Sequence, residues 1–302
     1  MLRDYRVTQF ASLFSDGIEM DAPTSPAERR RRRADVLRES AGRKLARYCS
    51  DITHAMKPRA LAGLPGTVDF LVREKSIGVA GLPDARNSRH VPDGLAGIAA
   101  DLTPNAIVDA YSRGLFLRWM LGQATFWAPQ SRWLAAPQDI AGPHALAALL
   151  KGRNYRITLD REFDAVVNAA TAETIRRRAP YAPSARGMHV FAALHDAGFA
   201  HSVEIRDRAG ELAGGLYGVA CGRMFVIQGR FGLTGDVAGL AVLALNRHLQ
   251  DWGFEILDGC ADNELHRLGF TEHSREAHLA MIPGSLSGGR PGRWLVSPGL
   301  LG

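Results

Sequence analysis

The 302-residue sequence predicts an α+β fold: a mixed sheet with flanking helices, preceded by a mostly helical basic N-terminal extension. Two patterns support this prediction. From residue 154 onward, short alternating apolar segments and helical apolar periods follow one another, and near residues 25–48 apolar positions at helical spacing follow a run of arginines. A composition of 46% hydrophobic and 23% charged residues excludes collagen-like, low-complexity and wholly disordered chains.

The net charge of +6 is concentrated in one segment. Residues 28–47 hold nine basic and three acidic residues, and the rest of the chain is close to neutral. Ser25 as N-cap and Pro26 at the first helical position predict a helix that begins there. Two interpretations of its basic run stay open, a solvated helix and a contact with RNA phosphates. The run consists of Arg29, Arg30, Arg31, Arg32 and Arg33.

Breaker residues predict a loop or linker at 78–97, and the pattern becomes regular after residue 154. A strand is expected at 155–159, with Asp160 as a cap for the helix that follows. We then expect a second helix ending near Gly198, and three antiparallel strands at 200–206, 211–220 and 223–228. A glycine-containing loop at 229–235 leads to a long helix with Asp236 as its cap and Gly253 at its end. A strand at 254–258, a short helix near 263–267, a turn at Gly269 and a strand at 277–282 complete the order.

This order resembles the GNAT-type acyltransferase fold. In that fold two parallel strands separate, and the donor molecule enters the gap between them. The resemblance makes the loop from Gly229 to Gly235 a candidate phosphate site, because a helix N-terminus offers free N–H groups and a favourable dipole. The usual spacing of that motif is absent here, so a plain strand-to-helix turn is an equal alternative.

Cysteine usage and the N-terminus indicate a cytoplasmic protein that is not embedded in a membrane. Cys49, Cys221 and Cys260 are odd in number and far apart, which excludes a disulfide framework and a Cys-x-x-Cys metal site. The charged start of the chain differs from a signal peptide, and no apolar stretch reaches the roughly 18 residues that span a bilayer. We expect a monomer, and no histidine or carboxylate spacing indicates a metal site.

Several separated blocks resemble the leucyl/phenylalanyl-tRNA–protein transferase family. They lie in order at family-like spacing over roughly residues 100–282, namely 102–116, 126–129 with Arg132, 194–204 and 214–220. Residues before about 98 are unlike the family. We therefore divide the chain into an N-terminal extension with a basic helix and linker (1–98), a family-like segment (99–140) and a GNAT-like transferase domain with a short C-terminal tail (141–302).

The resemblance implies an enzyme that takes an aminoacyl group from charged tRNA and joins it to the α-amine of a protein or peptide that begins with Arg or Lys. The resemblance implies no metal and no organic cofactor. The donor ester is already activated, so positioning, one proton acceptor and donors for the oxyanion suffice. In the family, an Asp in an Asp-Cys-Gln run is proposed to orient or deprotonate the acceptor. Its counterpart is Asp258, which as a strand-end residue also fits a plain capping role.

The sequence departs from the family at the positions that set specificity. The acidic residue near the acceptor becomes Gln228, a Met of the donor pocket becomes Arg230, and the Gln of Asp-Cys-Gln becomes Cys260. The family has a tryptophan in each of two further runs. This sequence has Arg118 in place of the first, and Tyr181 lies near the position of the second. The remaining expected substrate contacts are the apolar wall residues Leu216, Val242, Leu245 and Leu257 and the aromatic residues Trp119 and Trp127.

These departures predict an aminoacyltransferase of altered donor and acceptor specificity. Two alternatives remain open at this stage. An acyl-CoA-dependent N-acyltransferase would use the 229–235 loop for pyrophosphate and Arg230 as a phosphate partner. A catalytically inactive homologue would bind tRNA through its five arginines without forming product.

Overall fold

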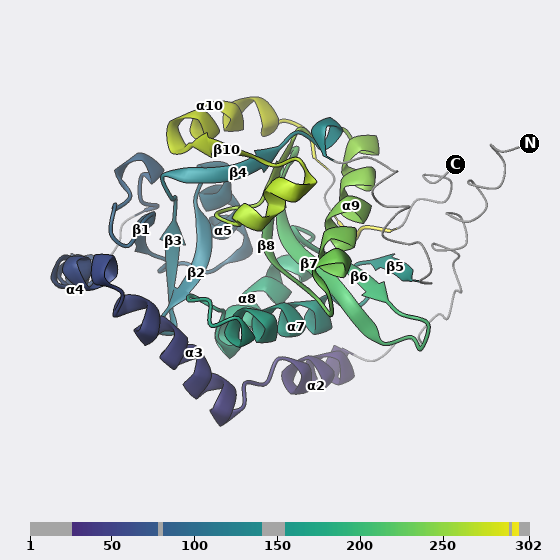
Figure 1. Ribbon diagram of the computed structural model, residues 1–302, viewed down its shortest axis with the longest axis horizontal. Helices are drawn as coiled ribbons and strands as arrows, with labels where there is room; N and C mark the ends of the chain where they lie inside the picture. The colour runs from purple at the N-terminus through teal and green to yellow at the C-terminus, as the bar shows by residue number, and fades with distance from the viewer. Residues whose placement is uncertain (1–25, 78–80, 141–154, 290–291, 296–302) are drawn as a thin grey trace, which may run out of the picture.

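The computed structural model describes residues 26–77, 81–140, 155–289 and 292–295, and its centre is a mixed seven-stranded sheet (Figure 1). The strand order is β10-β4-β9-β8-β7-β6-β5, and all neighbours are antiparallel except β8 and β9. The strands are β4 (Ser131–Ala135), β5 (Arg156–Leu159), β6 (Ala200–Arg206), β7 (Leu212–Cys221), β8 (Met224–Gly232), β9 (Ile256–Asp258) and β10 (Thr271–Ser274).

Helices cover both faces of this sheet. One face packs on α9 (Gly235–Asp251), and the other packs on α5 (Pro104–Ser112), α7 (Phe163–Arg176) and α8 (Ala185–Asp196). Alternate residues of a strand enter opposite layers. In β7, Leu216 joins the α9 layer, whereas Tyr217 joins the layer of α7 and α8. The predicted α+β class and the parallel crossover from β8 through α9 to β9 are confirmed.

A second, three-stranded sheet lies beside the main one. Its order is β1-β3-β2, with β1 (Leu95–Ile98), β2 (Phe116–Met120) and β3 (Gln123–Trp127) antiparallel. The short 3₁₀ helices are η2 (Ala85–Asn87), η3 (Pro137–Asp139) and η4 (Asn263–Leu268). The predicted loop at 78–97 therefore contains η2 and the start of β1, and residues 78–80 lie outside the described part.

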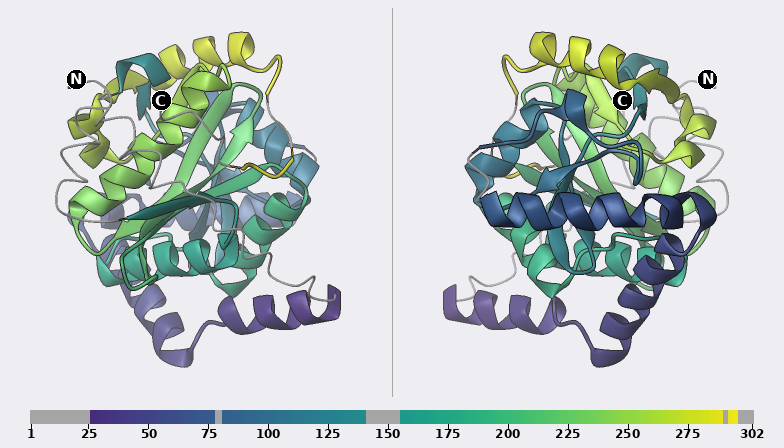
Figure 2. Two further views of the ribbon diagram at one scale, coloured as in Figure 1. Left: turned by 90° about the vertical axis from the view of Figure 1, so that its right-hand side faces the viewer. Right: turned by 90° about the vertical axis from the view of Figure 1, so that its left-hand side faces the viewer.

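The N-terminal extension is helical over its described residues 26–77, as predicted, and these helices lie on the outside of the molecule (Figure 2). It contains α2 (Pro26–Val36), α3 (Ala41–Ala55) and α4 (Pro58–Ile77). Helices α2 and α3 contact α7, and α4 contacts β1. The predicted cap Ser25 lies outside the described residues. The three-part division of the chain stays a prediction, although β4 of the middle segment is a strand of the main sheet.

Three local predictions were wrong. Residues 277–282 form part of α10 (Arg275–Ser285) instead of a strand; Ser274 caps this helix, and its buried positions recur at helical spacing. The 229–235 loop is much shorter, since β8 runs to residue 232 and Thr234 replaces Asp236 as the cap of α9. Asp160 does not cap α7, because its carboxylate binds His201 and a backbone N–H.

Candidate active site

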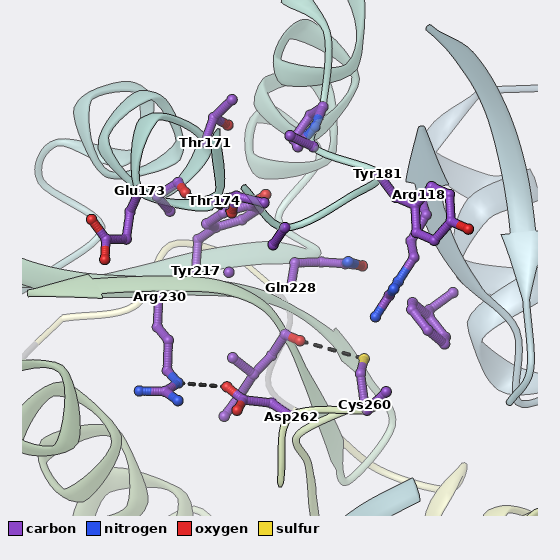
Figure 3. A pocket seen from close by; sticks show the side chains of 18 of the residues that line it. Arg118, Thr171, Glu173, Thr174, Tyr181, Tyr217, Gln228, Arg230, Cys260 and Asp262 are labelled. Carbon is purple, nitrogen blue, oxygen red and sulfur yellow. Dashed lines mark hydrogen bonds and ion pairs between the residues drawn. The ribbon is translucent and has the colours of Figure 1, made fainter. Parts of the chain in front are cut away.

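A cavity of about 320 Å³ lies where β8 and β9 separate (Figure 3). The last paired residues are Val226 and Asp258; beyond them β8 continues, and the chain after β9 turns away. The gap expected from the fold resemblance is therefore present. Its lining comes from the segments 116–119, 227–230 and 259–264 and from parts of 170–183, together with Phe191 and Tyr217.

Gln228 is an extra residue in β8, where the pairing with β7 shifts by one. Its side-chain oxygen accepts a hydrogen bond from the Tyr111 hydroxyl, and its amide nitrogen donates to the Leu117 carbonyl at 3.2 Å. Burial raises the pKa of Tyr111 well above its ordinary value, so this hydroxyl remains a donor. A carboxylate at position 228 has no N–H for Leu117, so the amide suits these contacts.

Arg230 enters the cavity from β8 and is held by two carboxylates (Figure 3). Its Nε atom lies 2.7 Å from Asp262 and its terminal nitrogen 2.8 Å from Glu264. Burial lowers the pKa of Arg230, but these carboxylates outweigh it and the net shift is upward. Glu264 also binds Arg177 at 3.1 Å, and Arg177 binds Glu173 at 2.6 Å. The five side chains form one paired network along the wall.

Arg118 projects from β2 into the same cavity (Figure 3). Its guanidinium carbon lies 5.2 Å from the ring centre of Phe116 and 5.8 Å from those of Trp127 and Tyr181. Partial burial lowers the pKa of this guanidinium. Within the described residues we find no carboxylate bound to Arg118, in contrast to Arg177 and Arg230.

Asp258 ends β9, is fully buried, and is not among the residues that line the cavity. Both of its oxygens bind the guanidinium of Arg132, Oδ1 accepts the Cys260 N–H at 2.7 Å, and His278 Nε2 lies 3.3 Å from Oδ2. Burial alone would raise the pKa of Asp258, but Arg132 and His278 outweigh it and hold the pKa far below its usual range. The carboxylate therefore stays ionised and fixes the turn that forms one cavity wall.

Cys260 lines the cavity with a thiol that lies 3.5 Å from the Ile227 carbonyl and so bridges the two separated strands. Its backbone is in the left-handed region, with φ of 56°. Burial raises the pKa of Cys260 to about 12, so the sulfur is a neutral thiol and a poor nucleophile.

The remaining expected contacts do not all meet at the cavity. Trp119 lines it. Trp127 does not line it but packs against the Arg118 guanidinium, and its ring N–H donates to the Thr125 hydroxyl at 2.8 Å. The four apolar residues are buried in the core between α9 and the sheet, and none of them lines the cavity; they are Leu216, Val242, Leu245 and Leu257.

The arginine run lies on α2, away from the cavity. Arg33 points back to the protein, where it binds Asp164 at 2.9 Å and Asp196 at 2.5 Å. Arg30, Arg31 and Arg32 are exposed. The run therefore combines an internal anchor with a solvent-facing basic surface.

Sequence reasoning missed a buried residue of the extension that holds two parts of the site. Asp51 on α3 accepts the backbone N–H of Tyr181 and that of Leu121, each at 2.8 Å. Both donor residues, Tyr181 and Leu121, have positive φ, 68° and 50°, which is strained for these residue types. The contacts of Tyr111 and Arg132 were also missed, because their partners lie more than a hundred residues away. The contact of His278 with Asp258 was missed because its segment was predicted to be a strand.

The described residues contain no cluster of metal-binding side chains and no helix long and apolar enough to cross a bilayer. The proposed phosphate loop has little space, since only residues 233–234 separate β8 from α9. Arg230, its suggested phosphate partner, is already bound to Asp262 and Glu264.

Comparison with known proteins gives a consistent result. Residues 134–283 match the family described as leucyl/phenylalanyl-tRNA protein transferase. A leucyl/phenylalanyl-tRNA–protein transferase of Pseudomonas entomophila (strain L48) is 34% identical over 203 residues, which is 66% of this chain and 89% of that protein. The chain belongs to the leucyl/phenylalanyl-tRNA–protein transferase family.

A second member of this transferase family, from Nitrosospira multiformis, is 37% identical over 190 residues, 61% of this chain and 80% of that protein. Among solved structures, a conserved protein of unknown function from Bacteroides thetaiotaomicron VPI-5482 aligns over 46% of this chain and 53% of its own, with 10% identity and a TM-score of 0.34. That alignment is too weak to support an argument.

Proposed function

We propose that this chain transfers an aminoacyl group from aminoacyl-tRNA to the amine of a protein or peptide N-terminus, with a specificity different from Leu or Phe donors and Arg or Lys acceptors. The observation that carries the proposal is the cavity at the separated strands. Two of its walls are residues 227–230 and 259–264, the segments that correspond to the specificity and Asp-Cys-Gln runs of the family.

The reaction needs no cofactor. The amine nitrogen attacks the ester carbonyl, a C–N bond forms, the C–O bond to the tRNA ribose breaks, and the amine proton passes to the departing oxygen. A partly enclosed cavity contributes by holding the amine against the ester and by limiting competing water. Gln228 and Arg230 are the proposed substrate contacts on β8, with Cys260 and Trp119 on the facing walls.

We propose that Asp258 supports this reaction through the turn that it holds. Its ion pair with Arg132 and its bond to the Cys260 N–H fix residues 259–262 against β8. The proposed tRNA contact is the exposed part of the arginine run, Arg30 to Arg32. We propose that the protein acts as a monomer, because a single chain supplies all these contacts. We also propose that it draws its donor from the aminoacyl-tRNA of the cytoplasm.

The test is incubation of the purified protein with total aminoacylated tRNA and a peptide library, with mass spectrometry to detect added aminoacyl groups. Thr174 lines the cavity, so Thr174→Trp should block transfer, whereas Thr53→Trp at an exposed position on α3 should leave it unchanged. Ordinary transfer of leucine to an Arg-starting peptide would contradict the altered specificity. Binding of tRNA without any product would support the inactive homologue, and transfer from acetyl-CoA would support the N-acyltransferase.

A further inference from the structure

Six charged side chains line the cavity, and among the described residues all of them except Arg118 form ion pairs. Glu173, Asp262 and Glu264 are ion-paired with Arg177 and Arg230. Glu173 also pairs with Arg176 outside the cavity, so this network holds three acidic and three basic groups. Arg118 is the remaining charged side chain of the lining, and the described residues give it no carboxylate.

The surroundings of Arg118 strengthen its attraction for an anion. Three aromatic rings pack around its guanidinium, so part of its surface is removed from water while its charge remains. An uncompensated charge in such a site interacts more strongly than it does in bulk water. The guanidinium also offers a planar pair of N–H donors that matches a carboxylate.

The same wall lacks a group that would receive a positively charged acceptor. Gln228 is neutral, and its amide is occupied by Tyr111 and by the carbonyl of Leu117, the residue next to Arg118. The carboxylates of the lining, at Glu173, Asp262 and Glu264, are already ion-paired, so an acceptor with a basic first side chain would meet Arg118 without a free countercharge. Like charges placed together at an interface are strongly unfavourable.

Resting on the function proposed above, we propose that Arg118 binds a carboxylate carried by the acceptor, so that the acceptors are amines with an acidic group close to the amine. Two sources fit this chemistry. One is the side chain of an N-terminal Asp or Glu of a peptide, and the other is the carboxylate of a free α-amino acid. A phosphate of the tRNA would also pair with a guanidinium, and the experiment below separates that outcome from an acceptor carboxylate.

The experiment compares transfer to peptides that differ only in their first residue, with Asp against Asn, Glu against Gln, and Arg, together with free amino acids against their amides. Wild-type protein should favour each carboxylate acceptor over its amide by about 10- to 100-fold in kcat/KM, the range of a charged hydrogen-bonded pair. Peptides or free amino acids then identify the source of the carboxylate.

Arg118→Gln should remove this preference while it retains transfer to the amide acceptors, and Arg118→Glu should favour the Arg-starting peptide. The matched control is Arg208→Gln in the exposed turn between β6 and β7, which should behave as wild type. Far-UV circular dichroism checks that each variant is folded, and Arg118→Lys, which keeps the charge and loses the fork, should retain part of the preference.

Two results overturn the proposal. One is a wild-type enzyme that does not distinguish carboxylate from amide acceptors. The other is an Arg118→Gln variant that loses activity equally for every acceptor while its KM for aminoacyl-tRNA rises, which would assign Arg118 to the donor. A thermal-shift titration with Asp- and Asn-starting peptides needs no turnover. If a peptide binds only when both its carboxylate and Arg118 are present, but no transfer occurs, the Arg118 site stands and the proposed function is rejected. If neither binding nor transfer is detected, the Arg118 site and the proposed function are both rejected.

Discussion

Arg132→Met should destabilise the protein by about 3 kcal/mol at pH 7.5, because it leaves the charge of Asp258 buried without its main partner. The two side chains are 2% and 0% exposed, and Arg132 binds both carboxylate oxygens. Loss of one partner of such a pair costs about 3–5 kcal/mol. We expect the lower end, because His278 at 3.3 Å can take up a proton and replace part of the lost charge.

The pH dependence of this cost has a definite sign. In the wild type the pKa of Asp258 is depressed, so its contribution to stability is complete above the ordinary pKa of about 3.9 and is lost as the pH falls below it. In Arg132→Met, burial dominates and the pKa of Asp258 rises. The native variant then binds a proton more tightly than its unfolded chain, so the penalty grows from pH 4.5 to pH 7.5.

Urea unfolding followed by circular dichroism at the two pH values measures this penalty. The matched control is Arg113→Met, which breaks an exposed pair with Asp109 and should cost less than about 1 kcal/mol. The double variant Arg132→Met with Asp258→Asn should recover much of the loss. A penalty for Arg132→Met no larger than that of the control, or one equal at both pH values, would refute the reasoning.

Three further predictions follow from other contacts. Asp51→Ala removes the acceptor of two backbone N–H groups and should cost about 1–3 kcal/mol in urea unfolding; unchanged stability and activity would contradict its role in holding the site. Arg230→Met makes the wall more apolar and should raise transfer of leucine relative to polar donors in a competition assay, and an unchanged donor profile counts against this. Arg33→Ala should lower the free energy of unfolding by up to about 1 kcal/mol. Arg31→Ala should leave stability unchanged and reduce the salt dependence of tRNA binding. If the two variants change stability and tRNA binding equally, the distinction between an anchoring Arg33 and a solvent-facing Arg31 is wrong.

The fold was predictable where the pattern was long and its caps were local. The strands and helices from residue 155 to residue 258 show repeated alternation or helical spacing, and Gly198 and Gly253 end helices with φ of 80° and 72°, as predicted. The segment 277–282 was too short to distinguish a strand from a helix, since six residues fit both the alternation of a strand and the spacing of a helix. Its cap at Ser274 and buried positions such as His278 decide for the helix.

The site was less predictable because its geometry depends on one extra residue and on distant partners. The shift at Gln228 changes which β8 side chains reach the cavity, and no local signal in the sequence marks it. Leu216 was expected at the donor wall, but it faces the α9 layer while its neighbour Tyr217 lines the cavity. The period of two gives opposite faces to these neighbours, so this distinction was available in the sequence.

The local charge of +6 at residues 28–47 does not act as a single surface. Arg33 and Arg47 are ion-paired with Asp164 and Glu39, and Arg43 donates to the side chain of Asn168. These contacts fasten α2 and α3, and α3 carries the carboxylate that holds the cavity segment at Tyr181. Part of the basic segment is therefore needed to shape the site. Arg30, Arg31 and Arg32 have no such contact among the described residues, and this leaves them available for the tRNA contact proposed above.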